Sequence, residues 1–406
     1  MTISSEKIRP FAGPAILSYG FRPFFLFGAL WAALAVALLL PMLSGHFVPP
    51  TAFAPIEWHV HELIYGYVPA VIAGFLLTAL PNWTGRLPIV GGPLLVLLLT
   101  WCAGRAAVLV SLFIGSWVAA AVDLAFLAAL VLLVAREIIS ANNRRNLKLL
   151  AIVAVLLIGN GLFHLEAIER IGDGYGTRLG IAAIVMLIML IGGRIIPSFT
   201  RNWLSRRGAG RLPQYFDRFD AAVVALSSLA LTGWVILPEK TATALMALAA
   251  CVLNLVRLSR WAGERTAAEP LLLILHVAFA FVPLGFLLLA LAILMPERVA
   301  PTGALHGWTA GAIGLMTLAV MTRAGLGHTG RSLTATGPIR LIYAAALTAA
   351  LARLVAAFGV LREPMLHLSA TAWVAAFVAF VVIYAPLLGR RVIATAELAN
   401  RDGGGR

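Results

Sequence analysis

The chain has 406 residues, of which 61% are hydrophobic and only 12% are charged. Soluble domains carry about 25% charged residues, so the composition excludes an ordinary soluble enzyme and favours a protein embedded in lipid. The formal net charge of +14 at pH 7 would suggest a nucleic-acid-binding protein if the chain were soluble. In a membrane protein, the positions of the basic residues along the chain indicate the orientation of the helices, and the net charge alone does not indicate a nucleic-acid partner.

Apolar runs recur along the whole chain and predict its architecture. A helix needs roughly 20 residues to cross the hydrocarbon core, and inside lipid its backbone groups must bond within the segment. We predict an all-α, polytopic membrane protein with about twelve transmembrane helices, arranged as a single integral-membrane domain over residues 1–406. No internal repeat is evident in the sequence. The predicted spans are 23–43, 62–80, 89–110, 115–135, 149–168, 179–198, 220–237, 241–257, 270–295, 304–323, 340–360 and 365–388.

The basic residues predict how these helices are oriented. Most of the 31 Lys and Arg residues fall in every second loop, in the short segment 1–20 or in the tail 389–406, and this asymmetry is typical of cytoplasmic loops. Both termini are therefore expected in the cytoplasm, and nucleic acid is not an expected partner. Arg105, Arg194 and Arg353 fall inside spans. The opposite face receives Arg170, Arg178, Lys240, Arg298 and Arg362.

Histidines near or inside the spans are the first candidates for a functional site. Ionisable side chains are costly in a bilayer and tend to face cavities, partners or cofactors, and neutral imidazole binds copper, zinc and iron, including haem iron. The alternative for each histidine is a hydrogen bond to another helix or to water. The predicted topology gives an external group of His59, His61, His164 and His306, and places His276 and His328 nearer the cytoplasm.

The stretch "IEWHVHELIYGY" (56–67) contains two histidines with one residue between them. On a regular helix, His59 and His61 would point about 200° apart and serve different partners. On an extended segment they would point the same way and could share one ion. Glu62 is a further candidate, as a metal ligand, as the acceptor that orients a ligating imidazole, or as a proton relay.

Arginines near the cytoplasmic ends of the spans are candidates for binding an anionic group. Arg194 lies in a glycine-rich span, and its alternative role is to extend to the membrane interface. Guanidinium groups bind carboxylates through paired hydrogen bonds, so a haem propionate is one possible ligand. The candidates for this role are Arg22, Arg194, Arg323 and Arg331.

The tenth predicted span carries glycines at intervals of three or four residues: Gly303, Gly307, Gly311 and Gly314. Small residues on one helix face allow a neighbouring helix to approach closely. A flat macrocycle could use the same surface, and the sequence leaves both interpretations open.

Five stretches of the chain together resemble the NnrS family. They are "FRPFF" (21–25), "WHVHELIYGY" (58–67), "GFLLTALPNWTGR" (74–86), "GGRIIPSFTRNW" (192–203) and "LAVMTRAGLGHTGR" (318–331). The resemblance runs from the first span to the tenth and accompanies the same twelve-span layout.

The resemblance implies a multi-pass protein of the bacterial inner membrane that contains haem, expected to be of the b type, and copper. It implies a link to nitric oxide and to nitrosative stress, with nitric oxide as ligand or substrate and an unspecified electron donor. If the protein is an enzyme, it is an oxidoreductase. The alternatives are non-enzymatic sensing or sequestration of nitric oxide, protection of iron pools, and transport of a metal or small solute.

Overall fold

The computed structural model describes residues 11–390. Residues 1–10 and 391–406, which belong to the predicted N-terminal segment and C-terminal tail, lie outside the described part. Within 11–390 every regular element is a helix, and twelve helical stretches are long and apolar enough to cross a membrane. This confirms the predicted all-α, polytopic architecture.

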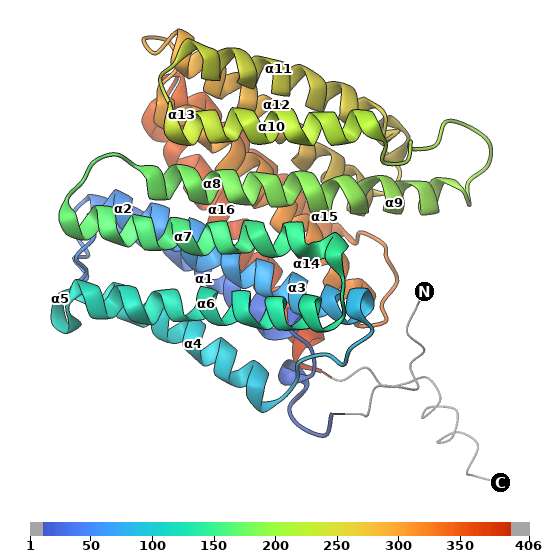
Figure 1. The fold of residues 1–406 in the computed structure, drawn as a ribbon, viewed down its shortest axis with the longest axis horizontal. Coiled ribbons are helices and arrows are strands. Elements are labelled where there is room, and N and C mark those ends of the chain that lie inside the picture. The colour runs from blue at the N-terminus through green and yellow to red at the C-terminus, as the bar shows by residue number, and fades with distance from the viewer. Residues whose placement is uncertain (1–10, 391–406) are drawn as a thin grey trace.

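Most spans are single helices that lie side by side across the bundle (Figure 1). These spans are α1 (Phe21–Leu43), α4 (Gly92–Leu109), α6 (Ser116–Ser140), α7 (Leu147–Glu169), α10 (Arg218–Ile236), α11 (Thr241–Ser259), α12 (Pro270–Leu294), α15 (Gly337–Ala357) and α16 (Arg362–Gly389). Short elements connect or precede them: η2 (Ala15–Leu17), α5 (Ser111–Ile114), η4 (Arg144–Asn146) and η6 (Gly263–Thr266).

Three spans within residues 11–390 contain a π-helical segment. A π segment is rare and is often found at functional sites. The second span consists of α2 (Pro55–His61), η3 (Glu62–Tyr67) and α3 (Val68–Thr84). The sixth consists of α8 (Tyr175–Leu187), η5 (Ile188–Gly192) and α9 (Gly193–Leu204), and the tenth of α13 (Pro301–His306), η7 (Gly307–Gly314) and α14 (Leu315–His328).

These three π-containing spans form the centre of the bundle. They contact one another, through α8 with η3, α8 with η7 and α3 with α14, and they are the most buried of the described spans. Two tyrosines tie them together: the Tyr65 hydroxyl donates to the Gly176 carbonyl (2.6 Å), and the Tyr67 hydroxyl donates to Thr317 Oγ1 (2.7 Å). The π segments lie in the second, sixth and tenth spans, at intervals of four spans. This regularity is not evident from the sequence.

The glycines of the tenth span face neighbouring helices. A Cβ at Gly303 would meet Ala357 of α15, at Gly307 or Gly311 it would meet α12, and at Gly314 it would meet Trp373 of α16. The described structure thus supports close helix packing as the reason for this glycine pattern.

The connections divide the bundle into two ends (Figure 1). The histidine end carries α2, α5, α13 and the connection from α7 to α8, and the arginine end carries the connections 205–217 and 260–269. Because consecutive spans cross the bundle in opposite directions, every second connection lies at the same end. The predicted external loops all lie at the histidine end.

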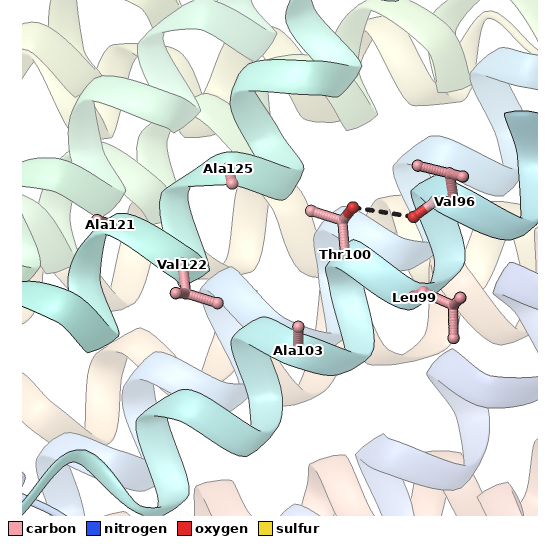
Figure 2. A pocket seen from close by; sticks show the side chains of 7 residues that line it. All are labelled: Val96, Leu99, Thr100, Ala103, Ala121, Val122 and Ala125. Atoms are coloured by element: carbon pink, nitrogen blue, oxygen red, sulfur yellow. Dashed lines mark hydrogen bonds between the residues drawn. The ribbon is translucent and has the colours of Figure 1, made fainter. Parts of the chain in front are cut away.

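The outer surface is apolar, as expected for contact with lipid. Between α4 and α6 lies a shallow groove of about 530 Å³ that is lined by Val96, Leu99, Thr100, Ala103, Ala121, Val122 and Ala125 (Figure 2). The hydroxyl of Thr100, the polar side chain among these residues, donates to the Val96 carbonyl of its own helix (2.9 Å). The groove therefore presents no unpaired side-chain polar group to lipid.

Candidate metal centre

The stretch that contains His59 and His61 is helical. Pro55 occupies the first turn of α2, where its missing N–H is harmless, and Glu57 Oε2 accepts the N–H of Ala54 (2.8 Å). The helix continues regularly to His61 before the π segment begins at Glu62. His59 and His61 therefore point to different sides of the span and serve different partners, which resolves the alternative left open by their spacing.

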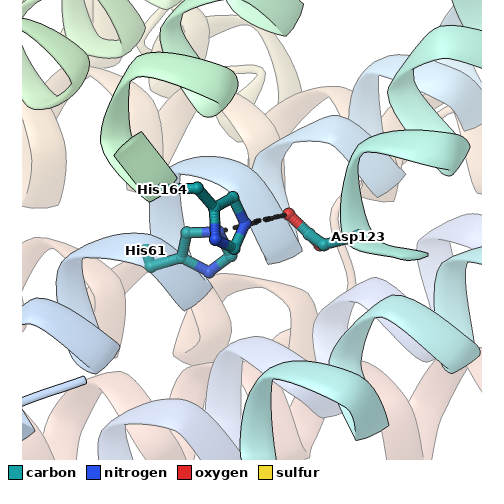
Figure 3. A group of neighbouring side chains, drawn as sticks. All are labelled: His61, Asp123 and His164. Atoms are coloured by element: carbon teal, nitrogen blue, oxygen red, sulfur yellow. Dashed lines mark hydrogen bonds and ion pairs between the residues drawn. The ribbon is translucent and has the colours of Figure 1, made fainter. Parts of the chain in front are cut away.

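His61 meets two residues from other spans in the buried interior. One ring nitrogen of His61, one ring nitrogen of His164 and one carboxylate oxygen of Asp123 lie within 4.8 Å of one another (Figure 3). The three residues come from α2, α7 and α6, and their exposure is 0%, 3% and 1%. Asp123 Oδ2 lies 3.3 Å from His61 Nε2 and 3.0 Å from His164 Nε2, and it accepts a hydrogen bond from Asn160 Nδ2 (2.7 Å). Two imidazoles and one carboxylate thus converge on one point.

A second carboxylate fixes the orientation of His61. Glu62 Oε1 lies 2.9 Å from His61 Nδ1, and Glu62 Oε2 accepts hydrogen bonds from Arg105 Nη1 (2.6 Å) and Trp31 Nε1 (2.7 Å). A Cβ at Gly66 would crowd both the Arg105 guanidinium and Glu62 Oε2, so this position requires glycine. Both oxygens of Glu62 are occupied, so Glu62 acts as the acceptor that orients an imidazole rather than as a free ligand.

Hydrogen-bond acceptors face both ring nitrogens of His61, which is more than a neutral imidazole can satisfy. A neutral imidazole carries one N–H. However, His61 Nδ1 faces Glu62, and His61 Nε2 faces two acceptors, Asp123 Oδ2 and Asn160 Oδ1 at 3.1 Å. The Asn160 amide nitrogen already donates to Asp123, so its oxygen must be the atom that faces His61. Either a second proton on His61 or a metal cation between these atoms satisfies both sides.

The charges of the same cluster lead to the same conclusion. Glu62 and Asp123 each contribute one negative charge, and Arg105 contributes one positive charge through ion pairs with both carboxylates. With neutral His61 and His164, the described residues of the cluster leave one negative charge unbalanced in a dry interior. Such a charge is strongly unfavourable unless it is paired or coordinates a metal. One further cation completes the cluster.

His59 and His306 lie at the same end of the bundle, in the second and the tenth span. The guanidinium of Arg353 in α15 acts electrostatically on both imidazoles. His306 Nδ1 donates to the Thr302 carbonyl (2.8 Å), which leaves the lone pair on Nε2. His59 Nδ1 is buried and has no hydrogen-bond partner among residues 11–390. The structure thus brings together two histidines of the predicted external group, His61 and His164, and gives His59 and His306 other surroundings.

The remaining two candidate histidines lie elsewhere and have different surroundings. His276 is buried in α12, with Nε2 2.9 Å from Thr200 Oγ1 and with Nδ1 unpaired among the described residues. His328 ends α14 and packs against the rings of Tyr19 and Phe21. The structure therefore does not join these two histidines into one site.

The candidate arginines also have separate environments. Arg22 donates to the carbonyl oxygens of Leu388 (2.7 Å) and Arg390 (2.8 Å) at the end of α16. Arg323 stacks on the Phe199 ring, with the guanidinium carbon 4.4 Å from the ring centre. Arg194 is exposed and donates to Asn146 Oδ1 (3.2 Å), and Arg331 is exposed after the end of α14. They are dispersed along the arginine end, away from the His61 cluster.

Comparison with known families places the chain. A sequence profile described as NnrS protein matches residues 15–391, nearly the whole chain. The chain belongs to the NnrS family. This confirms the resemblance inferred from the five sequence stretches, and with twelve apolar helices it identifies a multi-pass membrane protein of a family associated with nitric oxide. No curated protein matches the chain.

Three residues of the cluster in this NnrS chain were not among the candidates from sequence: Arg105, Asp123 and Asn160. Asp123 is a carboxylate within the apolar run "SWVAAAVDLAFLAALVLLVA". Isolated ionisable groups within a span usually mark a functional site, and this rule would have selected both Asp123 and Arg105. That they meet each other and His61 depends on how α4, α6 and α7 pack, which the sequence pattern does not specify.

Proposed function

We propose that this NnrS chain holds copper and haem at the histidine end of the bundle and there binds or reduces nitric oxide, in defence against nitrosative stress. The supporting observation is His61 Nε2, which faces two oxygen acceptors in a cluster that lacks one positive charge. We further propose that the protein lies in the bacterial inner membrane with the arginine end in the cytoplasm, because arginine-rich loops are retained there.

The donor set of the cluster fits copper. Imidazole nitrogens suit copper, and the carboxylate oxygen of Asp123 is a compatible third ligand. The carboxylate of Glu62 on His61 Nδ1 is the outer partner typical of a metal-bound histidine, because it fixes the ring and leaves Nε2 for the ion. Copper held there would supply a redox-active centre that can bind nitric oxide. The protein residues hold the ion, neutralise its charge and keep lipid away from it.

The pair of His59 and His306 fits a haem iron. The two imidazoles come from different spans, one has a buried nitrogen without a partner and the other has its Nε2 lone pair available. The guanidinium of Arg353 acts electrostatically on both rings, and a guanidinium is a suitable partner for a propionate. We therefore assign the haem to this pair rather than to the arginines of the opposite end.

The assignment is tested by measuring copper content and the optical spectrum of protein purified from haem-replete cells. His61→Ala and His164→Ala should lower the copper content and retain the Soret band. His59→Ala and His306→Ala should lower the haem content and retain copper. If the wild type has neither copper nor a Soret band, the cofactor proposal is wrong, and a role in transport would gain support. If all four variants keep both cofactors, the sites are wrong.

A gas assay separates turnover from binding. Reduction joins two nitric oxide molecules with two electrons and two protons to give one nitrous oxide and one water. Nitrous oxide that accumulates beyond one equivalent per protein, with an artificial electron donor present, would establish an enzyme. Stoichiometric loss of nitric oxide without nitrous oxide would instead establish sequestration or sensing. The His61→Ala variant is the control, because it should fold but lack the copper ligand.

A further inference from the structure

A small cavity of about 70 Å³ opens at the histidine end and reaches the buried cluster. Its wall is formed by the connection before α2, by α5, by the start of α6 and by the end of α7. The partly or fully exposed residues Ser116 and Arg170 lie at its mouth, and the buried His164 lies on its inner wall. Because His164 Nε2 is 3.0 Å from Asp123 Oδ2, the cavity ends at one of the proposed copper ligands.

The polar lining indicates that the cavity is more than a packing defect. Empty voids in proteins are apolar, whereas a polar cavity larger than roughly 10–15 Å³ of probe-occupied volume can hold water. Ser111, Ser116, His164 and Arg170 all contribute to this wall. The cavity has room for more than one water molecule and can therefore admit a small hydrated solute.

Phe53 borders both this cavity and the cluster. Its ring lines the cavity and also packs against both imidazoles, with ring centres 5.2 Å from His61 and 5.5 Å from His164. The connection that carries Phe53 is held in place: the Ala52 N–H donates to Ser111 Oγ (2.8 Å), and the Thr51 hydroxyl donates to the Val108 carbonyl (2.8 Å). The Phe53 ring therefore borders the path from the cavity, where a solute can already meet His164, to His61, which does not line the cavity.

We propose that this cavity is the port through which copper reaches the site formed by His61, Asp123 and His164, with Phe53 as its inner gate. This inference rests on the proposed copper site. It adds that the site is loaded from the histidine end, so the opposite membrane face gives no access to it. The occupant is a hydrated copper ion or a small copper complex, which exchanges its water or carrier ligands for the two imidazoles and the carboxylate.

The first test measures the rate at which copper binds to metal-depleted full-length protein in detergent. Ala119→Trp fills the cavity and should slow loading by about tenfold or more, equivalent to ~1.4 kcal/mol in the barrier. Phe53→Ala removes the gate and should speed loading. Both variants should reach the wild-type copper content and retain the helical circular dichroism spectrum.

Phe126→Ala is the matched control for the gate. Phe126 is a buried phenylalanine of α6 that packs on Phe24, with ring centres 5.7 Å apart, and it does not line the cavity. Its replacement should leave the loading rate unchanged. Equal rates in the wild type, Ala119→Trp and Phe53→Ala would overturn the port, although the copper site itself would stand. A wild type that takes up no copper would overturn both the copper site and the port.

The second test measures access without relying on copper. Cys102 and Cys251 are replaced by alanine, and a single cysteine is introduced as Ala119→Cys. A charged, membrane-impermeant thiol reagent should label it in sealed vesicles from the histidine-end side only. Ala120→Cys is the control, because Ala120 is equally buried but does not line the cavity. Absence of labelling at Ala119→Cys, or equal labelling of both variants, would contradict a port at this position.

Discussion

Two ion-pair clusters, each with a buried carboxylate, lie at opposite ends of the bundle and differ in their charge balance. At the arginine end, Asp217 and Asp220 meet two guanidinium groups: Arg257 Nε donates to Asp220 Oδ1 (2.9 Å), and Arg260 forms ion pairs with both carboxylates. Two negative charges thus face two positive charges. No further ion is needed there.

At the histidine end, Glu62 and Asp123 also form a pair of carboxylates, but they share the single guanidinium of Arg105. Where the arginine end has a second guanidinium, the histidine end has the imidazoles of His61 and His164. At the arginine end, guanidinium groups alone balance the two carboxylates. At the histidine end, neutral imidazoles leave one negative charge, which a second proton on His61 or, as we propose, a bound metal cation would balance. The following variants test this comparison.

The largest effect is expected for Asp123→Asn. This change removes a ligand charge and should lower copper affinity by more than the 10–100-fold that loss of an outer partner typically costs. Copper titration of the purified protein measures the affinity. The loss of affinity in Glu62→Gln should lie within that 10–100-fold range. Asp220→Asn is the matched control, since it removes a buried carboxylate from the other cluster and should leave the copper content unchanged. Copper loss from Asp220→Asn would show that the effect is general destabilisation.

Arg105→Met should destabilise the fold strongly. It leaves Glu62 and Asp123 without their shared partner, and breaking a buried ion pair costs about 3–5 kcal/mol. Thermal unfolding in detergent measures the loss. Copper should recover more stability in Arg105→Met than in the wild type, because the cation then faces two unpaired carboxylates. Equal stabilisation of the two proteins by copper would argue against a shared electrostatic cluster.

Tyr67→Phe should have a moderate effect on stability. It removes the hydrogen bond from the second span to Thr317 of the tenth, and such bonds between membrane helices contribute about 0.6–1.7 kcal/mol. Unfolding measurements should show a loss in this range with unchanged copper content. A loss of copper would mean that the contact between Tyr67 and Thr317 is also needed to position the copper ligands.

The smallest effect is expected at the exposed Asp217. The hydrogen bond from Arg260 lowers the pKa of this carboxyl to about 2, below its ordinary value near 3.9. The stabilisation is therefore complete above pH ~4 and is lost as the pH falls towards ~2. Asp217→Asn retains a helix-capping side chain but removes the negative charge that faces Arg260. The variant should therefore unfold slightly more easily than the wild type at neutral pH. This difference should vanish at low pH, whereas a difference that grows with acid would contradict the pKa shift.

Much of the fold is predictable from the sequence. The apolar runs locate all twelve spans, because lipid requires each span to be a long apolar helix. The π segments at Glu62–Tyr67, Ile188–Gly192 and Gly307–Gly314 could not be predicted in this way. They depend on how the three central spans pack.

The candidate site was only partly predictable. His61, His164 and Glu62 are recognisable as polar residues near apolar runs, and Pro55 with Glu57 marks the helix start that separates His59 from His61. Asp123 carries a signal of its own as an ionisable group within a span. Its position opposite both imidazoles could not be foreseen, because it requires the side-to-side packing of α6 against α7 and the close approach of α4 at Gly104.

The most direct test of the central claim is X-ray absorption at the copper edge of the purified protein, compared with His164→Ala. We expect scattering from two imidazoles and one oxygen ligand in the wild type. In the variant, one imidazole should be lost and the oxygen ligand should remain. A wild-type spectrum dominated by sulfur ligands, or one that is identical in His164→Ala, would contradict a copper site at His61, Asp123 and His164.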